Sequence, residues 1–333
     1  MAGDTASVLR ELESKGSRPI VVASHPRSGT HLCIDLLRLN FEPCRSRKAW
    51  FERADRLYFS LDAFGRADQS FDAHLAKRIL GRTARPIVKT HSLSDLSTGG
   101  LQRSPWRIRP ELADWFRSNA SIVYTYRDGR EVLRSLYYFM QSFEPVARVP
   151  FSQFIRQEIR GMSRARVWAE HTRTWLAHPK ALCLSMDQIR RDCAQTLDTI
   201  ARSLDLPPLR HVPKVPSRCN SDIVSRAWRR ILPEPGSTAI VAYRKNECFG
   251  HWRDAFSDPA DREFFHREAG DLLIALGYEK SDRWVTAAAS DLQVSKTDFP
   301  SEGEPLNAQT TRPSLRGNTP PSYSREQSGL VHA

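Results

Sequence analysis

Short apolar runs alternate along the chain with longer stretches in which apolar residues recur at helical spacing. Residues Pro19 to Ser24 form a run rich in β-branched residues that predicts a buried strand, and His31 to Leu39 has the spacing of a helix. The same order recurs further along, with strands predicted at 86–91, 121–126 and 181–185 and with helices reaching about Gln141 and Leu204. Strands that alternate with helices form parallel sheets. We therefore predict a three-layer α/β fold, in which a central parallel sheet carries helices on both faces.

The two ends of the chain differ from this central part. Residues 1–17 predict a short leading helix before the first strand. After Trp284 the composition shifts to Ser, Thr, Pro, Gly and Gln with few apolar residues, which is typical of a disordered segment. We therefore expect a leader segment at 1–17, one domain at 18–285 and a disordered tail at 286–333.

Composition and charge narrow the class of protein. The hydrophobic fraction of 40% is enough for a sizeable core, and no run of about 18 apolar residues exists to span a membrane. The N-terminus carries acidic residues where a signal peptide needs basic ones, so we expect a cytoplasmic location. The six cysteines lack the C-x-x-C spacing of zinc or redox sites. The net charge of +12 comes from basic residues spread through the chain, which favours an acidic ligand over nucleic acid.

The segment that joins the first predicted strand to its helix has the features of an anion-binding loop. Gly29 allows the backbone to approach a bound anion, and Arg27 supplies a full positive charge. Ser28 and Thr30 offer hydroxyl and amide donors where the positive end of a helix dipole is expected. The loop lacks the Gly-Lys pair of the nucleotide-hydrolase P-loop. It predicts a phosphate site, and the alternative is an ordinary turn between a strand and a helix.

A second segment with phosphate-binding features joins the strand at 121–126 to its helix. Arg127 follows the carboxyl end of that strand, where ligands bind in parallel sheets. Ser135 lies about two helical turns further on, which returns it to one face of the helix. Together they predict a second phosphate contact. In the alternative, Arg127 is a surface ion-pair partner of Asp128 or Glu131.

Three segments, taken in order, carry a resemblance to a known family. The sequence PRSGTH after the first strand resembles the 5′-phosphosulfate loop of the cytosolic-type sulfotransferases, which use 3′-phosphoadenosine 5′-phosphosulfate (PAPS). The sequence YRDGREVLRSLYYF resembles their 3′-phosphate motif. Residues 243–256 resemble the R-K-G-x-x-G-D-W-K-x-x-F signature, whose basic pair, here Arg244 and Lys245, also contacts the 3′-phosphate. The resemblance covers about residues 18–280 and implies a P-loop NTPase-like fold.

The resemblance also implies roles for individual residues. Lys89 to His91 looks like the family's K-T-H segment, whose histidine removes the proton of the acceptor hydroxyl, and an imidazole pKa near 6.5 suits that step. Lys89 would add a cation beside Arg27, which stands where the family commonly has lysine. Because these cations take the place of a metal, we expect no metal requirement. The residues implied to bind PAPS are Arg27, Ser28, Gly29, Thr30, His31, Arg127, Ser135, Arg244 and Lys245.

The chain departs from the family where adenine would be held. Leu32 stands where animal members have a tryptophan that stacks on adenine. Ser185 stands in place of the tyrosine that opens the family's Y-E-D segment. We therefore expect a base pocket that is built differently.

The function that these residues predict is transfer of a sulfuryl group from PAPS to a hydroxyl or amine of a small molecule, carbohydrate or lipid. The expected substrate loops, about 50–82 and 143–160, carry no code that names the acceptor, and no pattern indicates an oligomeric state. A P-loop-type small-molecule kinase is one alternative, which magnesium-dependent use of ATP would support. A catalytically silent nucleotide-binding protein is another, which binding without turnover would support.

Overall fold

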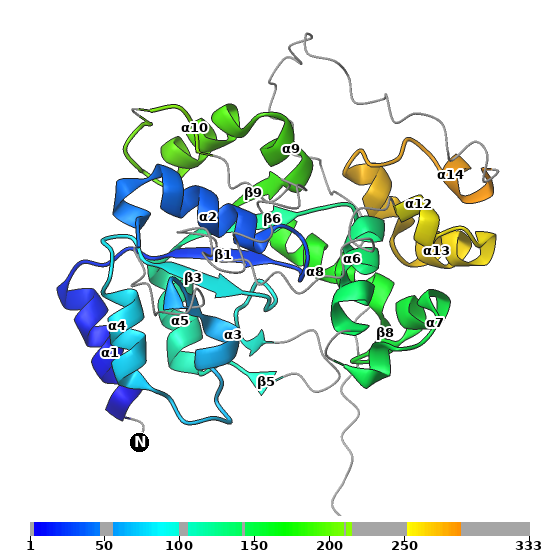
Figure 1. The fold of residues 1–333 in the computed structure, drawn as a ribbon. Coiled ribbons are helices and arrows are strands. Elements are labelled where there is room, and N and C mark those ends of the chain that lie inside the picture. Colours follow the sequence, from blue (N-terminus) through cyan, green and yellow to red (C-terminus); the bar gives the residue numbers. More distant parts are fainter. Residues whose placement is uncertain are drawn as a thin grey trace, which may run out of the picture. The chain divides into compact units, whose positions relative to one another are not determined.

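A computed structural model gives the fold and describes residues 3–46, 56–99, 106–141, 144–209, 211–214 and 252–287. Its main sheet has five parallel strands in the order β2, β3, β1, β6 and β9 (Figure 1). The strands are β1 (Ile20–Ser24), β2 (Phe59–Ser60), β3 (Ile87–Thr90), β6 (Ser121–Tyr126) and β9 (Ala181–Ser185). The predicted parallel sheet is therefore confirmed, and the two-residue strand β2 extends it at one edge.

Helices cover both faces of this sheet because successive strand residues point to opposite sides. Val22 faces one helical layer, formed by α2, α9 and α10, while its neighbour Val21 faces the other, formed by α1, α4 and α5. The predicted three layers are thus confirmed (Figure 1). The bounds of these helices are α1 (Gly3–Ser14), α2 (Thr30–Asn40), α4 (Ala73–Leu80), α5 (Pro110–Asn119), α9 (Met186–Arg191) and α10 (Cys193–Ser203).

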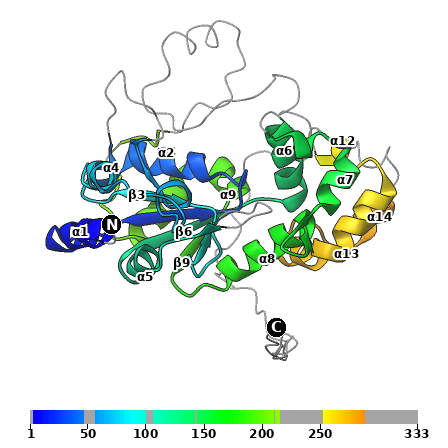
Figure 2. The ribbon, with the colours of Figure 1, turned by 90° about the horizontal axis from the view of Figure 1, so that it is seen from below.

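A further group of helices packs beyond the carboxyl ends of the strands. Figures 1 and 2 show α6, α7, α8 and α12 to α14 together at that end of the sheet. They share a core of their own, to which Phe154, Trp168 and Phe265 contribute large buried side chains. The bounds are α6 (Gly129–Gln141), α7 (Phe151–Arg156), α8 (Arg164–Leu176), α12 (Trp252–Ala255), α13 (Pro259–Ala275) and α14 (Arg283–Thr286).

Short elements complete the described part of the chain. Two antiparallel ribbons pair β4 with β5 and β7 with β8. The short helix α3 follows β2 directly and contacts β3. These elements are β4 (Thr98–Gly99), β5 (Trp106–Arg107), β7 (Glu158–Ile159), β8 (Met162–Ser163), α3 (Leu61–Phe64) and the 3-10 turns η1 (Glu42–Cys44) and η3 (Pro145–Ala147).

The stretch after β9, predicted as one helix reaching Leu204, consists of two helices. Asp192 separates α9 from α10 with a φ of −140°, which is outside the helical range. Its carboxylate accepts a hydrogen bond from the backbone N–H of Gln195 at 2.8 Å and so caps α10. The single predicted helix was therefore wrong, because an aspartate inside the apolar pattern starts a second helix.

Some predictions fall outside the described residues. The tail expected at 286–333 does so apart from Thr286 and Ala287, and so do Arg244 and Lys245. Among the helices that are described, none combines the length and the apolar character needed to cross a bilayer. The cysteines in the described ranges are free, namely Cys33, Cys44, Cys183 and Cys193.

Candidate active site

The loop between β1 and α2 has a backbone that can enclose an anion. Arg27 and Gly29 both adopt left-handed φ angles, of 73° and 97°. The chain thus turns sharply before α2 begins at Thr30, where the N–H groups and the positive dipole end of the helix face the loop. A Cβ atom at Gly29 would lie 2.5 Å from Sδ of Met186, the first residue of α9. The left-handed backbone therefore favours glycine here, and any larger residue would also displace the side chain of Met186.

Ser28 gives this loop a buried donor that has no partner among the described residues. Its side chain is fully buried, and its hydroxyl makes no hydrogen bond within the described ranges. Buried hydroxyl groups are normally hydrogen-bonded, so this group is suited to a bound anion. The hydroxyl of Thr30, by contrast, contacts the hydroxyl of Ser24, and its contribution to an anion would come from the backbone N–H.

The two predicted phosphate motifs meet at Arg27. Its Nε donates a hydrogen bond to Oγ of Ser135 at 3.1 Å. Its guanidinium also lies over the ring of Phe139, 4.9 Å from the ring centroid. Ser135 and Phe139 both belong to α6, one helical turn apart. The structure therefore brings the cation of the first loop to the helix of the second motif.

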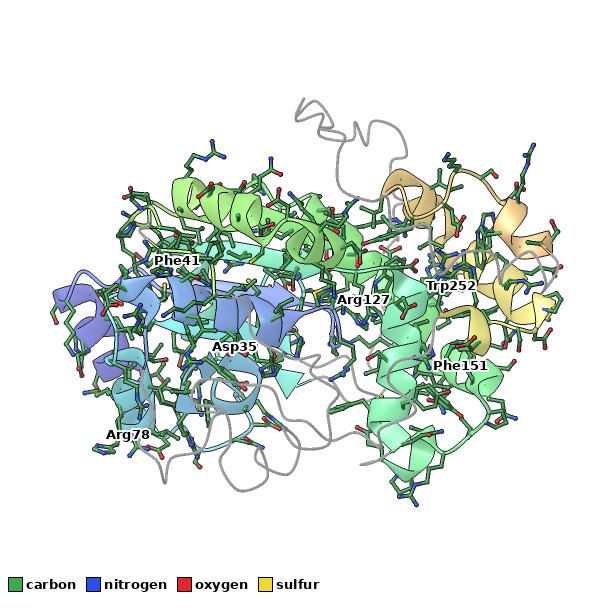
Figure 3. The ribbon with its side chains drawn as sticks, turned by 45° about the horizontal axis from the view of Figure 1, so that its top comes forward. Asp35, Phe41, Arg78, Arg127, Phe151 and Trp252 are labelled. Atoms are coloured by element: carbon green, nitrogen blue, oxygen red, sulfur yellow. The ribbon has the colours of Figure 1, made fainter. Side chains whose placement is uncertain are left out.

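Arg127 lies at the end of β6, where the sheet meets the helices that carry Phe151 and Trp252 (Figure 3). Its Nη2 donates to Oε2 of Glu131 at 3.0 Å, and its side chain is 19% exposed. Burial lowers the pKa of Arg127, and the carboxylate of Glu131 opposes that shift. The ion pair that the sequence offered as an alternative is thus present, but it is mostly buried rather than on the surface.

His91 lies directly beside the phosphate loop. Its Nδ1 is 2.8 Å from the carbonyl oxygen of Ser24, and the N–H of Nδ1 donates to that carbonyl because it can only accept. This tautomer leaves Nε2 with its lone pair. Burial and the nearby Lys89 cation hold the pKa of His91 well below 6.5, so the ring is neutral at pH 7. A neutral imidazole with an open lone pair can accept a proton.

Lys89 and His91 share a carboxylate that the sequence analysis missed. Asp62, on α3, accepts hydrogen bonds from the backbone N–H of His91 at 2.6 Å and from Oγ1 of Thr90 at 3.0 Å. Burial lowers the pKa of Lys89, and the charge of Asp62 raises it again. No sequence signal marks Asp62, because the helix that carries it has only four residues. The structure therefore adds an acidic group beside the predicted base.

Other histidines near the loop are engaged differently. His25 is buried, with Nδ1 at 2.9 Å from the carbonyl of Pro26, and burial lowers its pKa to about 4. His31, at the start of α2, packs edge-on against Tyr58 with ring centroids 5.6 Å apart. The charge of His31 also lowers the pKa of His91, so His31 lies close enough to interact with it electrostatically.

The two residues that differ from the family's adenine site have structural roles here. Leu32 is 6% exposed and packs in the core between α2 and the sheet, so its side chain faces the protein interior. Oγ of Ser185 accepts hydrogen bonds from the backbone N–H groups of Asp187 and Gln188 and caps α9. The expectation of a different base pocket stays a prediction.

A metal site would need several His, Cys, Asp or Glu side chains close together in the described ranges. Within these ranges, no group of three or more His, Cys, Asp or Glu side chains could hold a metal ion. The metal independence expected from the sequence remains a prediction.

The chain is similar to a known protein family and to a curated sulfotransferase. A family model described as the sulfotransferase domain matches residues 17–267. A 3-beta-hydroxysteroid sulfotransferase of Cavia porcellus is 23% identical over 212 residues. That alignment covers 61% of this chain and 66% of the relative, just under two thirds of its length.

Solved structures of low sequence identity are also similar. Mouse sulfotransferase SULT7A1 complexed with PAP has 14% identity and a TM-score of 0.44, with 84% of this chain and 93% of that chain covered. Retinol dehydratase in complex with androsterone and inactive cofactor PAP has 18% identity and a TM-score of 0.42, with 77% and 81% covered. Retinol dehydratase with retinol and PAP has 18% identity and a TM-score of 0.44, with 80% and 86% covered.

Proposed function

The chain belongs to the sulfotransferase domain family, and we propose from this premise that it transfers a sulfuryl group from PAPS to an acceptor hydroxyl or amine. One contact carries the proposal. Nδ1 of His91 lies 2.8 Å from the carbonyl oxygen of Ser24, the residue that precedes the phosphate loop. The candidate base and the candidate anion site are therefore next to each other.

The residues of the loop fit the phosphosulfate end of PAPS. Ser28 offers a buried hydroxyl without a described partner, Gly29 leaves the backbone open, and α2 adds its N–H groups. When bound, PAPS supplies the activated sulfuryl group and a phosphate leaving group. Arg127 and Ser135 would hold the 3′-phosphate, and Arg244 and Lys245 are proposed for the same role although they lie outside the described residues.

His91 would act as the base. With Nδ1–H bound to the Ser24 carbonyl, Nε2 can take the proton of the acceptor hydroxyl as its oxygen bonds to sulfur. Lys89 and Arg27 would supply positive charge, Lys89 to the sulfuryl oxygens and Arg27 to the leaving phosphate.

The acceptor class is proposed as a small molecule, carbohydrate or lipid. A hydroxysteroid is one candidate to test, because the curated relative is named a 3-beta-hydroxysteroid sulfotransferase. We also propose that no metal takes part, since Arg27 and Lys89 supply the cations that the transfer needs.

The test is incubation of the purified protein with ³⁵S-labelled PAPS, a hydroxysteroid and extracts of the source organism, in the presence of EDTA. We expect a labelled product. His91→Ala should lower turnover by about 10²- to 10⁴-fold and leave the affinity for the desulfated nucleotide unchanged, because the base does not bind the nucleotide.

The exposed His211 lies outside the expected substrate loops and provides a matched control, and His211→Ala should keep full turnover. Absence of any labelled product, or magnesium-dependent transfer of phosphate from ATP instead, would overturn the proposed function. Near-wild-type turnover of His91→Ala would overturn the role of the base alone.

A further inference from the structure

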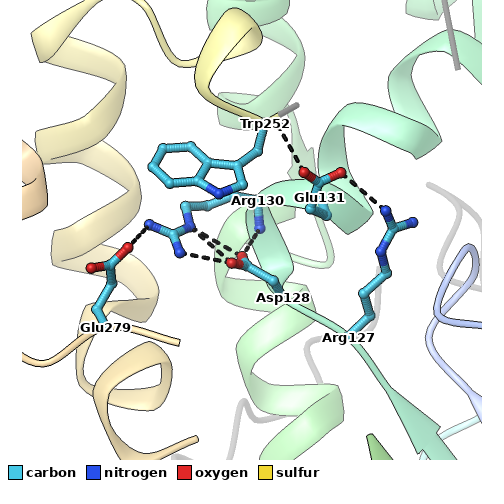
Figure 4. Close-up of polar contacts among 6 residues, drawn as sticks. All are labelled: Arg127, Asp128, Arg130, Glu131, Trp252 and Glu279. Atoms are coloured by element: carbon cyan, nitrogen blue, oxygen red, sulfur yellow. Dashed lines mark hydrogen bonds and ion pairs between the residues drawn. The ribbon is translucent and has the colours of Figure 1, made fainter. Parts of the chain in front are cut away.

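Glu131 lies between Arg127, the residue proposed to bind the 3′-phosphate, and Trp252, the first residue of helix α12 (Figure 4). Its Oε2 accepts a hydrogen bond from Nη2 of Arg127 at 3.0 Å. Its Oε1 accepts one from the backbone N–H of Trp252 at 2.9 Å. The carboxylate is 17% exposed, so both contacts are shielded from water. One side chain therefore joins two parts of the chain that are 121 positions apart.

The contact with Arg127 leaves part of the guanidinium available. Within the described ranges, only Nη2 donates to Glu131, while Nε and Nη1 make no hydrogen bond that would occupy their N–H groups. A guanidinium presents its donors in a fixed planar fork. Holding one edge of that fork therefore sets the direction in which the other edge points. Glu131 and a phosphate can bind Arg127 at the same time.

The contact with Trp252 anchors the chain that follows residues 243–251. Trp252 is the first residue of α12, and its ring lies under the guanidinium of Arg130, 3.7 Å from the centroid. Arg130 and Glu131 are consecutive in α6, and both contact Trp252. Arg130 contacts its ring, and Glu131 accepts a hydrogen bond from its backbone N–H. The position at which α12 begins is thus set by the same turn that carries Arg127.

We propose that Glu131 is a positioning residue that makes the site selective for a nucleotide with a 3′-phosphate, by holding the guanidinium of Arg127 in the orientation that receives it. This inference rests on the proposed function, in which Arg127 binds the 3′-phosphate. A carboxylate that competed with the phosphate would have the opposite effect, and its removal would tighten binding.

The experiment compares two ligands that differ by one group. Calorimetry measures the affinities of adenosine 3′,5′-bisphosphate and adenosine 5′-monophosphate for the wild type, Glu131→Gln, Arg127→Ala and the double variant. In Glu131→Gln the amide oxygen still accepts from the N–H of Trp252, while the charge that holds Arg127 is lost. Glu170→Gln removes one carboxylate from a half-buried i,i+3 ion pair with Arg173 on α8 and serves as the control.

We expect Glu131→Gln to weaken bisphosphate binding about tenfold and to leave monophosphate binding unchanged. Arg127→Ala should weaken bisphosphate binding by about tenfold or more, and adding Glu131→Gln to it should change nothing further. Glu170→Gln should bind both nucleotides as the wild type does.

The possible failures are distinguishable. If the wild type does not prefer the bisphosphate, or if Arg127→Ala keeps that preference, the assignment of Arg127 in the proposed function fails, and the inference fails with it. If Arg127→Ala loses the preference but Glu131→Gln keeps or increases it, the inference alone is overturned. An equal loss for both nucleotides in Glu131→Gln would show that Glu131 only supports the fold, which also overturns it.

Discussion

The histidines around the start of the phosphate loop differ in the ring atoms that they already use. His171 is fully buried with both nitrogens engaged, Nδ1 at 3.1 Å from the hydroxyl of Tyr124 and Nε2 at 3.1 Å from the carbonyl of Ser92. His91 uses only Nδ1 in its described contacts. A ring with both nitrogens occupied cannot exchange a proton with a substrate without losing a contact. We therefore assign the role of the base to His91, because its Nε2 makes no hydrogen bond in the described contacts, while both ring nitrogens of His171 are engaged.

This assignment predicts the pH dependence of the reaction. Burial and the Lys89 cation lower the pKa of His91, so its neutral form persists to more acidic pH than in an ordinary imidazole. The acidic limb of kcat/KM for the donor should therefore lie below pH 6.5. In Lys89→Met the nearby positive charge is gone, the pKa of His91 rises, and the limb should move up by about one pH unit. An acidic limb above pH 6.5 in the wild type, or one that Lys89→Met leaves in place, would contradict the assignment.

At the scale of the elements, the parts that could be predicted are those shaped by neighbouring residues. β1, its loop and α2 follow from a β-branched run, a glycine and helical spacing that lie next to one another in the sequence. Asp62 could not be predicted, because it meets His91 from 29 positions away on a helix too short to show periodicity. The contact of Glu131 with Trp252 depends likewise on packing between distant segments.

The loop after β1 gives a prediction about how elements pack around it. Gly29→Ala places a Cβ against Sδ of Met186 at a φ of 97°, so the variant suffers both a left-handed backbone and an overlap with α9. We expect a loss of about 2–5 kcal/mol in the free energy of unfolding. Nucleotide affinity should fall by about tenfold, because the strained loop or the Met186 side chain beside it must shift. Urea unfolding and calorimetry with adenosine 3′,5′-bisphosphate measure the two effects.

Gly161 offers a matched control for the stability cost of placing alanine in a left-handed backbone conformation. Its φ is 74°, also left-handed, but a Cβ there would have no atom within 4 Å. Gly161→Ala should therefore cost about 1–2 kcal/mol and leave nucleotide binding intact. If both alanine variants lost the same stability and bound the nucleotide alike, contact with α9 would not shape the loop.

At the scale of the whole molecule, two distant stretches of sequence share one core. Helices α6 to α8 and α12 to α14 contribute jointly to the cluster beyond the carboxyl ends of the strands. Arg130, 1% exposed, lies in it with ion pairs to Asp128 at 2.7 Å and to Glu279, and its guanidinium contacts the rings of Trp252 and Trp284. One buried cation therefore adds to the contacts that hold the C-terminal helices to the turn that carries Arg127.

Arg130→Ala should be strongly destabilising for this reason. The substitution leaves the carboxylates of Asp128 and Glu279 without their cation in a poorly solvated place, and it opens space beside Trp252. Breaking a buried ion pair from one side costs about 3–5 kcal/mol. Urea unfolding followed by tryptophan fluorescence and by circular dichroism measures the change, and agreement between the two probes justifies a single free energy of unfolding.

Arg173 tests whether burial, rather than the linking of segments, is the cause. Like Arg130, Arg173 links two distant segments of the chain. Its ion pair with Asp271, at 2.7 Å, joins α8 to α13, but the two side chains are 29% and 75% exposed. Water already solvates these charges, so Arg173→Ala should cost no more than about 1 kcal/mol. Comparable losses in the two variants would mean that any cross-link between these helices stabilises them equally. A loss confined to Arg130→Ala would mean that the burial of its ion pairs, and not the linking of two segments, is the source of the stabilisation.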